Sequence, residues 1–463
     1  MYPAQALSPK TAIATGGINS SVTTVIVDDA TVLPDAPNIV TIGTGHNAEV
    51  IKYTGKDTGG TPHELTGCTR AFEGVAASWA AGTPVYRGLA AYDINTIQGR
   101  IVAHHLPNNY LVADKDNNYN HMVYIPRFNW DPSNGFSSAE IHPAFIVNET
   151  EARGIMVGKY QACLINAAGA VQTSTTTRNT DALITTGGLR AASLPRYDPQ
   201  NRIDYDRAVL ACSEMNGNGI TGWHLMTNAE WAAIALWCKH NSITPFGNNN
   251  YGRDTDNRSI VGRLADGVFG TSGEGRWLTG SGGALTSHDR TMGGIFDLHG
   301  NVWEWVMGLK TVEGKIHVLG NKNASPDAAG NSFAADEAQW WDTGWYTHYD
   351  PDAGAVITLH DANAGVLQAD TTRTRNFGDL GFHASAGATG RTMLQQLAII
   401  GNAAGAAVYD NDVFYMRSSS TRVALRGGSV NAGALAGVFA VTLGSERTNS
   451  NHNVGFRPAF AVI

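Results

Sequence analysis

Side chains that could catalyse a reaction are spread along this 463-residue sequence without forming a known catalytic pattern. It contains no G-x-x-x-x-G-K-S/T phosphate loop, no H-E-x-x-H zinc helix and no G-x-S-x-G nucleophile elbow. Gly43-Thr44-Gly45 has the first glycines of a dinucleotide loop, but the short strands around it offer no helix to receive a pyrophosphate. The acidic residues show no pair set apart as acid and base. We therefore expect no enzymatic activity and no cofactor.

Possible metal ligands are equally dispersed. His104 and His105 are adjacent, so they point to different sides of any regular element, and we expect them to be exposed or partly packed. No two cysteines form a C-x-x-C pair, and four scattered cysteines in so long a chain do not indicate a disulfide framework. We expect no metal site, and we expect mostly buried thiols at Cys68, Cys163, Cys212 and Cys238.

Three segments are more informative. They are Gly222–Trp231 (GWHLMTNAEW), Gly294–Val306 (GIFDLHGNVWEWV), and a closing run from Arg426-Gly427-Gly428 to Gly455-Phe456-Arg457-Pro458. In the second, Trp303 and Trp305 alternate as in a strand with one buried face. Taken singly, each segment is equally typical of ordinary core and turn.

A buried arginine in the closing run would need a partner. Arg457 lies between apolar neighbours, and a buried guanidinium requires a carboxylate or carbonyl to compensate its charge. We predict that Glu304 or Asp297 pairs with Arg426 or Arg457.

Two helices are predicted in the region that contains these segments. Asp204–Met215 places apolar residues on one face and ends at Asn216-Gly217. Thr227 and Glu230 form a capping box, and a buried helical stripe starts at Trp231. Beyond residue 240 the chain reads mostly as loops, including the region 310–395.

The first 90 residues predict a small all-β domain. Short β-branched runs at Val22–Val27, Ile39–Ile42, Val50–Tyr53 and Val85–Tyr86 are separated by turn residues. Residues 91–119 predict a neck and linker, with a short helical period over Tyr92–His105 and an Asn- and Asp-rich stretch from Pro107 to Asn120. Residues 120–463 predict one large domain.

Composition narrows the class of protein. The formal net charge is −8 and no run of Lys and Arg is present, which argues against nucleic-acid binding. No apolar run approaches the roughly 18–20 residues of a membrane span, and residues 1–17 lack the pattern of a signal peptide. Charged residues make up only 16%, while there are 53 glycines and 11 tryptophans, which favours a loop-rich structure held by aromatic anchors.

Together, the ordered segments resemble the C-type lectin fold of the formylglycine-generating enzyme type. The matching words are Leu225–Trp231, Asp297–Trp305, Arg426–Val430 and Gly455–Arg457, and the resemblance covers about residues 120–463. It implies an α+β architecture with this lectin fold in the C-terminal domain and the small all-β domain before it. The enzymes of this type need cysteines in the C-terminal segment as nucleophiles, and this chain has none after Cys238.

Residues 424–460 resemble the variable region of proteins diversified by retroelements, such as phage tropism determinants. In that family, short invariant motifs, here called framing words, flank the variable positions. They correspond to Arg426–Ser429, Ala436–Ala440 and Val454–Pro458, and DNDVFY at Asp410–Tyr415 is also similar. Val430 departs from the pattern, because the family usually has Trp there. The N-terminal domain is similar to virion-attachment modules of phage tail proteins.

This second resemblance implies a phage or prophage tail receptor-binding protein located in the virion, at a tail fibre or tail tip. Its partners would be a host-surface protein or glycan, and other tail or baseplate proteins through the N-terminal domain. It would form a homotrimer and insert into no membrane. The alternatives are a degenerate enzyme of the formylglycine-generating type and a structural tail subunit without receptor.

Variable positions should be exposed side chains held between fixed apolar anchors. We expect them to cluster on one solvent-exposed face. The candidates are Asn431, Ala432, Leu435, Thr442, Gly444, Ser445, Glu446, Asn449, Asn451 and His452.

Overall fold

The computed structural model of the chain describes residues 11–33, 35–43, 49–73, 76–87, 101–103, 106, 108–147, 150–172, 184, 188–265, 275–319, 340–350, 356–362 and 371–462. Most of its described elements are strands, and the helices are few. The chain divides into two compact units: residues 1–120 with 218–220, and residues 121–217 with 221–463. Within the described part of the chain, all helices lie in the second unit.

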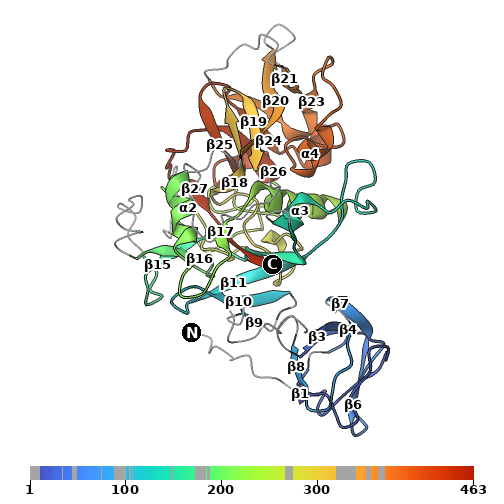
Figure 1. Cartoon of the computed structure of the whole chain (residues 1–463). Coiled ribbons are helices and arrows are strands. Elements are labelled where there is room, and N and C mark those ends of the chain that lie inside the picture. Colours follow the sequence, from blue (N-terminus) through green and yellow to red (C-terminus); the bar gives the residue numbers. More distant parts are fainter. Residues whose placement is uncertain are drawn as a thin grey trace. The chain divides into compact units, whose positions relative to one another are not determined.

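The first unit contains two small antiparallel sheets (Figure 1). One has the strand order β1-β8-β3-β4-β7 and the other the order β2-β6-β5. The strands are β1 (Thr11–Ala12), β2 (Val25–Val27), β3 (Asn38–Ile42), β4 (Glu49–Tyr53), β5 (Gly55–Asp57), β6 (His63–Thr66), β7 (Thr69–Glu73) and β8 (Pro84–Arg87). The four β-branched runs identified in the sequence are therefore confirmed as β2, β3, β4 and β8.

The expected neck and linker differ from the structure where they are described. Strand β9 (Ile101–Ala103) pairs antiparallel with β10 (Asn109–Ala113), and β11 (Tyr119–Pro126) begins inside the stretch expected to be a linker. Of the stretch Tyr92–His105, for which we expected a short helical period, only Ile101–Ala103 is described, and it forms a strand because its β-branched residues favour strands once a partner strand is available. Residues 88–100, His104 and His105 lie outside the described residues.

One sheet of the second unit collects strands from distant parts of the sequence. In the order β17-β28-β14-β11, the strands are β17 (Trp223–Leu225), β28 (Pro458–Val462), β14 (Gly154–Gly158) and β11. The last strand of the chain, β28, therefore lies between β14 and β17, with Met156 and Trp223 both opposite Phe460. This places the closing segment in the centre of the fold.

A larger sheet carries the rest of the closing segment. Its order is β22-β24-β26-β25-β18-β19-β20-β21-β23, and β27 (Val454–Phe456) runs parallel to β18. The strands are β18 (Trp303–Val312), β19 (Lys315–Leu319), β20 (Trp340–Asp350), β21 (Val356–His360), β22 (Arg373–Asn376), β23 (Gly381–Phe382), β24 (Val413–Met416), β25 (Thr421–Gly427) and β26 (Gly437–Ser445). The prediction of loops over 310–395 is thus wrong for most described residues of that region, because they include strands β19 to β23 and most of helix α4 (Arg391–Gln396).

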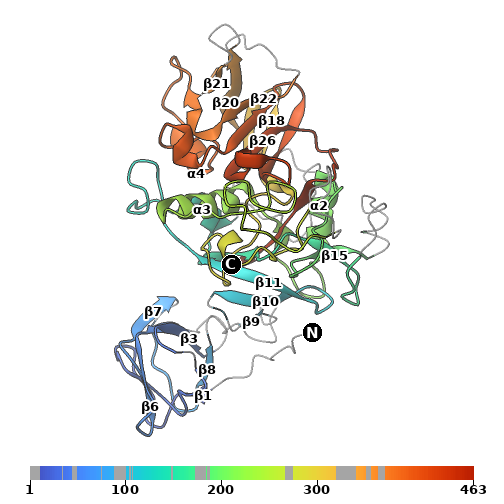
Figure 2. The ribbon, with the colours of Figure 1, turned by 180° about the vertical axis from the view of Figure 1, so that it is seen from behind.

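The two predicted helices are confirmed as α2 (Tyr205–Ser213) and α3 (Asn228–His240). Helix α3 starts with the expected capping box, in which the Thr227 hydroxyl accepts from the Glu230 N–H and the Glu230 carboxylate accepts from the Thr227 N–H. It lies between the two sheets of the second unit (Figures 1 and 2), and Trp231, Ile234 and Ala235 are buried in the main core. The capping box therefore fixes the start of the helix on which both sheets pack.

The remaining elements are short. They are β12 (Ile146–Val147), β13 (Thr150–Glu151), β15 (Cys163–Ile165), β16 (Arg190–Ala192), η3 (Pro143–Phe145), η4 (Ala284–Thr286), η6 (Phe377–Asp379), η7 (Ala406–Tyr409) and η8 (Gly433–Leu435). All four cysteines are buried and free, as predicted. In the described part of the chain, no helix is long and apolar enough to cross a membrane.

Strand β18 corrects one expectation about the tryptophans. Both faces of this strand are buried from Trp303 to Thr311, because β18 lies in the middle of the large sheet and the main core covers one face while α2 and its flanking loop cover the other. Trp305 is completely buried, and its indole Nε1 donates to the Ile203 carbonyl at 3.0 Å.

Candidate recognition surface

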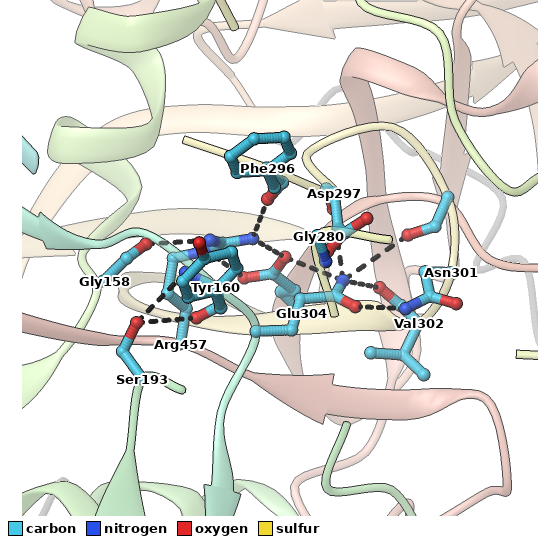
Figure 3. A network of polar contacts seen from close by, with 12 residues as sticks. Gly158, Tyr160, Ser193, Gly280, Phe296, Asp297, Asn301, Val302, Glu304 and Arg457 are labelled. Atoms are coloured by element: carbon cyan, nitrogen blue, oxygen red, sulfur yellow. Dashed lines mark hydrogen bonds and ion pairs between the residues drawn. The ribbon is translucent and has the colours of Figure 1, made fainter. Parts of the chain in front are cut away.

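A buried ion pair lies at the centre of the second unit. Arg457 donates from Nε and Nη2 to the two carboxylate oxygens of Glu304, at 3.0 and 2.7 Å. Its remaining donors reach the carbonyls of Gly158 and Phe296, both at 2.8 Å (Figure 3). The predicted pairing of a closing-segment arginine with Glu304 is confirmed, and it ties β27 and β28 to β18 and β14.

The Gln161 side chain makes several polar contacts with the loop before β18. Its amide nitrogen lies within hydrogen-bond distance of the carbonyls of Asp297, Gly300 and Val302 and of the Glu304 carboxylate. Its carbonyl oxygen accepts from Asn301 Nδ2 at 2.9 Å. The motif GNVWEW therefore serves as a buried polar support. Among the described residues, no group of His, Cys, Asp and Glu side chains could hold a metal ion.

Arg426 is held without a carboxylate. Its Nε and Nη2 donate to Asn228 Oδ1 at 2.9 and 2.7 Å, and Nη2 also donates to the Ala398 carbonyl. Burial lowers the pKa of Arg426 to about 9, which leaves it charged at neutral pH. Because Asn228 is the first residue of α3, Arg426 joins β25 to that helix.

Two buried carboxyl groups support the same region. Burial raises the pKa of Asp297 to about 6, and its Oδ2 accepts from the Gly280 N–H at 2.8 Å. Burial also raises the pKa of Asp412 well above its usual value, while Oδ2 accepts from the Phe439 N–H at 2.7 Å. Asp412 belongs to the DNDVFY segment, and a Cβ at Gly437 would meet its Oδ1 at 1.9 Å. Asp412 therefore fixes the start of β26.

The turn after β25 requires glycine. Gly427 and Gly428 have φ values of +90° and +84°, and a Cβ on Gly427 would lie 3.1 Å from the Leu298 carbonyl and from the Trp231 ring. Val430, which departs from the family pattern, is fully buried, and its N–H donates to the Asn301 carbonyl at 3.2 Å. The backbone thus leaves the core directly after Val430.

The structure places nine of the ten candidate positions at the surface. Asn431, Glu446 and Asn451 are exposed. The half-buried positions are Ala432, Leu435, Gly444, Ser445, Asn449 and His452. They occupy the loop around η8, the end of β26 and the turn that leads to β27.

Thr442 does not fit the expectation, because only 8% of this residue is exposed. In the sheet it lies between Tyr415 of β24 and Leu425 of β25. The rings of Tyr415 and Trp303, from two strands separated by β25 and β26, meet edge to face at 6.3 Å. We infer that the two rings meet over this part of the sheet and cover Thr442.

Polar contacts join two of the three surface stretches. Asn453 Nδ2 donates to Ser429 Oγ at 3.0 Å and lies 3.4 Å from Asn431 Oδ1, which brings the η8 loop to the last turn. Within that turn, Asn449 Nδ2 lies 3.4 Å from Ser445 Oγ, and Arg422 pairs with Glu446 at 2.8 Å. The last turn also rests on the segment before α2, since the Arg202 N–H donates to the Asn451 carbonyl.

Sequence reasoning missed several residues that build this surface. Asn453, Tyr415 and Arg422 contact candidate positions directly, and Asn228 holds Arg426. Tyr415 lay in a recognised segment, so its place next to the variable region was a usable signal. The roles of Asn228 and Arg422 depend on contacts between distant residues, for which the sequence carries no local signal.

Comparisons with known proteins give only weak likenesses. No family model matches the chain, and no curated protein matches it. Among solved structures, the chain is similar to the Major Tropism Determinant I1 Variant, with 10% identity over 97% of this chain and 87% of that chain and a TM-score of 0.26. For the U1 and M1 Variants the identities are 12% and 11%, both over 97% of this chain and 86% of the other, with a TM-score of 0.27. Scores of this size do not establish a shared fold.

Proposed function

We propose that this chain is a phage or prophage tail receptor-binding protein whose closing segment presents a diversifiable recognition surface on a lectin-type scaffold. One observation carries the proposal: the framing words and the stretches between them differ completely in burial. Every residue of Arg426–Ser429, Ala436–Ala440 and Val454–Pro458 is buried, whereas residues 431–435 and 444–453 are all exposed or half-buried.

This arrangement suits a surface that changes while the fold persists. Exposed substitutions away from caps and buried pairs usually change the free energy of unfolding by no more than about 0.5 kcal/mol. A few contact residues carry most of the energy of a protein interface, each contributing about 2 kcal/mol or more. Substitutions in the exposed stretches would therefore alter binding far more than folding.

The polar centre argues for a scaffold rather than a catalytic site. Glu304, Arg457 and Asn301 are all engaged in buried contacts that join strands and loops. We propose that the chain is not an enzyme of the formylglycine-generating type, since no cysteine follows Cys238.

We also propose a homotrimer that joins other tail proteins through residues 1–90 in the virion. Light scattering at micromolar concentration tests the trimer, and a monomer mass would contradict it.

The receptor-binding role is tested with a combined Asn431→Ala, Glu446→Ala, Asn451→Ala and His452→Ala variant. We expect it to stay folded with a modest loss of stability, because Glu446→Ala removes the carboxylate that is paired with Arg422. We expect its adsorption to host cells to fall at least tenfold or to move to other strains of a bacterial panel. The matched control is a combined Asp256→Ala, Arg258→Ala and Ser259→Ala variant, which alters exposed residues outside the closing segment. Equal adsorption of the parent and the four-site variant would show that the receptor site lies elsewhere.

A further inference from the structure

Tyr415 lies beside the stretches that carry the candidate positions. In the large sheet it pairs with Thr374 of β22 on one side and with Thr442 of β26 on the other. Residues that are directly paired on neighbouring strands project from the same face of a sheet, so these three side chains share one face. The candidate positions at the end of β26 continue from there, because Gly444 follows Thr442 by two residues.

Contacts connect Tyr415 to the candidate positions in two directions. The Tyr415 ring meets the Trp303 ring edge to face at 6.3 Å, and the Trp303 N–H donates to the Asn453 carbonyl at 2.8 Å. At the end of β26, a Cβ on Gly444 would lie 3.7 Å from the Thr372 side chain. The last turn and the end of β26 therefore both adjoin the face that carries Tyr415.

The polar ends on this face are available to a ligand. Thr372 and Thr374 are exposed, and their hydroxyls make no hydrogen bond to the described residues. Tyr415 is half-buried, and its hydroxyl makes no such bond either and does not belong to the buried polar atoms that lack a partner, so it reaches solvent. Burial raises the pKa of Tyr415, so its hydroxyl stays protonated at neutral pH. Each of the three hydroxyls can both donate and accept.

The two arginines of β22 belong to the opposite face of the sheet. Arg373 and Arg375 alternate with Thr374 along the strand. The guanidinium carbon of Arg373 lies 4.4 Å from the ring of Tyr349, which packs in the main core. The strand β22 therefore contributes a hydroxyl, and not a cation, to the face that it shares with Tyr415.

The adjoining turn is polar rather than apolar. Residues 444–453 contain no Val, Leu, Ile, Met, Phe, Tyr or Trp. Of their charged side chains, Glu446 is paired with Arg422 at 2.8 Å. Arg447 is paired with Asp206. The buried core of a protein–protein interface is more apolar than this, with about 65% non-polar area. A ligand rich in hydroxyl groups fits better, because hydroxyls and amides both donate and accept.

We propose that Tyr415, Thr372 and Thr374 form a fixed saccharide-binding platform within the recognition surface, and that the receptor group bound there is a glycan. This inference rests on the proposed function for the identity of the receptor. A sugar ring has a face of C–H groups, which packs on an aromatic ring, and a rim of hydroxyls, which bind the Thr and Tyr hydroxyls. Trp303 holds the Tyr415 ring by its edge-to-face contact. The exposed candidate positions would then select among glycans.

The test uses the full-length chain and cells of one adsorbing strain, which are untreated, oxidised with sodium periodate or digested with proteinase K. Periodate cleaves the vicinal diols of sugar rings, so we expect oxidised cells to adsorb the chain about tenfold less. Digested cells should adsorb it as untreated cells do. Adsorption that survives periodate and is lost after proteinase K would identify a protein receptor, and the inference would be wrong while the proposed function stands.

Substitutions on the platform form the second part of the test. Tyr415→Ala removes the stacking ring and should lower adsorption about tenfold. Tyr415→Phe and Thr374→Val each remove one hydroxyl and keep the shape of the side chain, so we expect about threefold weaker adsorption at an unchanged melting temperature. The matched control is Tyr119→Ala, which removes another half-buried ring at the start of β11 and should adsorb as the parent does.

Tyr415→Phe and Thr374→Val keep the test decisive even if Tyr415→Ala does not fold. If both adsorb as well as the parent, the inference is wrong. If both adsorb more weakly but the four-site surface variant adsorbs normally, the proposed diversifiable surface fails and the platform remains.

Discussion

Within the closing segment, buried and exposed residues follow one another in blocks. The framing words Arg426–Ser429 and Val454–Pro458 are wholly buried and make contacts across the second unit, to α3, β14 and β18. Between them, the turn at 444–453 contacts its own residues, the η8 loop, Arg422, Arg276 and the start of α2. The comparison teaches that two adjoining parts of one short segment can obey different physical constraints, because only one of them is wholly buried.

The comparison is tested most severely at Arg457. Arg457→Ala should lower the free energy of unfolding by about 3–5 kcal/mol, because it leaves the buried Glu304 carboxylate without its partner. The Gly158 and Phe296 carbonyls would also lose their donors. Urea denaturation followed by tryptophan fluorescence measures the change. Arg258→Ala is the control on an exposed arginine, and equal stability of the two variants would mean that Arg457 does not hold the fold.

These contacts also show how much of the fold the sequence could predict. The capping box of α3 and the Glu304–Arg457 pair were predictable, since one is a local pattern and the other follows from the cost of burying a cation. Strand β22 was harder to predict, because its partner β24 is distant in the sequence. Strand β19 did carry a local signal, since it follows β18 after the turn Glu313-Gly314 and alternates polar and apolar residues. The burial of Thr442 was hidden too, since its neighbours in the sheet, Tyr415 and Leu425, belong to two other strands.

The second test measures how the stability of the scaffold depends on pH, through the buried carboxyl group of Asp297. The folded pKa of Asp297 is raised from 3.8 to about 6 by burial, so the folded state binds this proton more tightly than the unfolded state. Its contribution to stability is complete below about pH 4 and is lost as pH rises through 6. The shift of about two pKa units corresponds to about 3 kcal/mol. Asp297→Asn should therefore be more stable than the parent at pH 7.5 and close to it at pH 4.

The difference between parent and variant isolates Asp297 from other titrating groups. Burial lowers the pKa of His142 and of His288 to about 4, so both favour the opposite trend and destabilise the fold as pH falls from 6.5. Both histidines are present in parent and variant and cancel in the comparison. Urea titrations at pH 4, 5, 6 and 7.5 give the curve. A constant difference across this range would mean that Asp297 has an ordinary pKa.

A third test lies on the boundary between the two kinds of region. Thr442 was a candidate surface position, yet it is buried between Tyr415 and Leu425. Thr442→Tyr should lower the free energy of unfolding by about 1–3 kcal/mol, since a larger side chain forces its packed neighbours to move. Differential scanning calorimetry measures the loss. A variant as stable as the parent would return Thr442 to the exposed set and enlarge the recognition surface by one strand position.

The smallest effect is expected at Asn451, which receives the same substitution. Asn451 is exposed, and its hydrogen bonds to described residues come from the backbone, with its carbonyl accepting from the Arg202 and Val454 N–H groups. Its backbone N–H lies 3.3 Å from Asn449 Oδ1, a contact that the new side chain leaves in place. Asn451→Tyr should therefore change the free energy of unfolding by no more than about 0.5 kcal/mol. The same ring, placed at the surface, should change adsorption to host cells, because aromatic side chains add large contact areas at interfaces.

The pair of tyrosine variants thus compares one substitution at a buried and at an exposed position of the same segment. If Asn451→Tyr destabilised the chain as much as Thr442→Tyr, burial would not distinguish scaffold from surface here, and the division of the closing segment into two kinds of region would have to be abandoned.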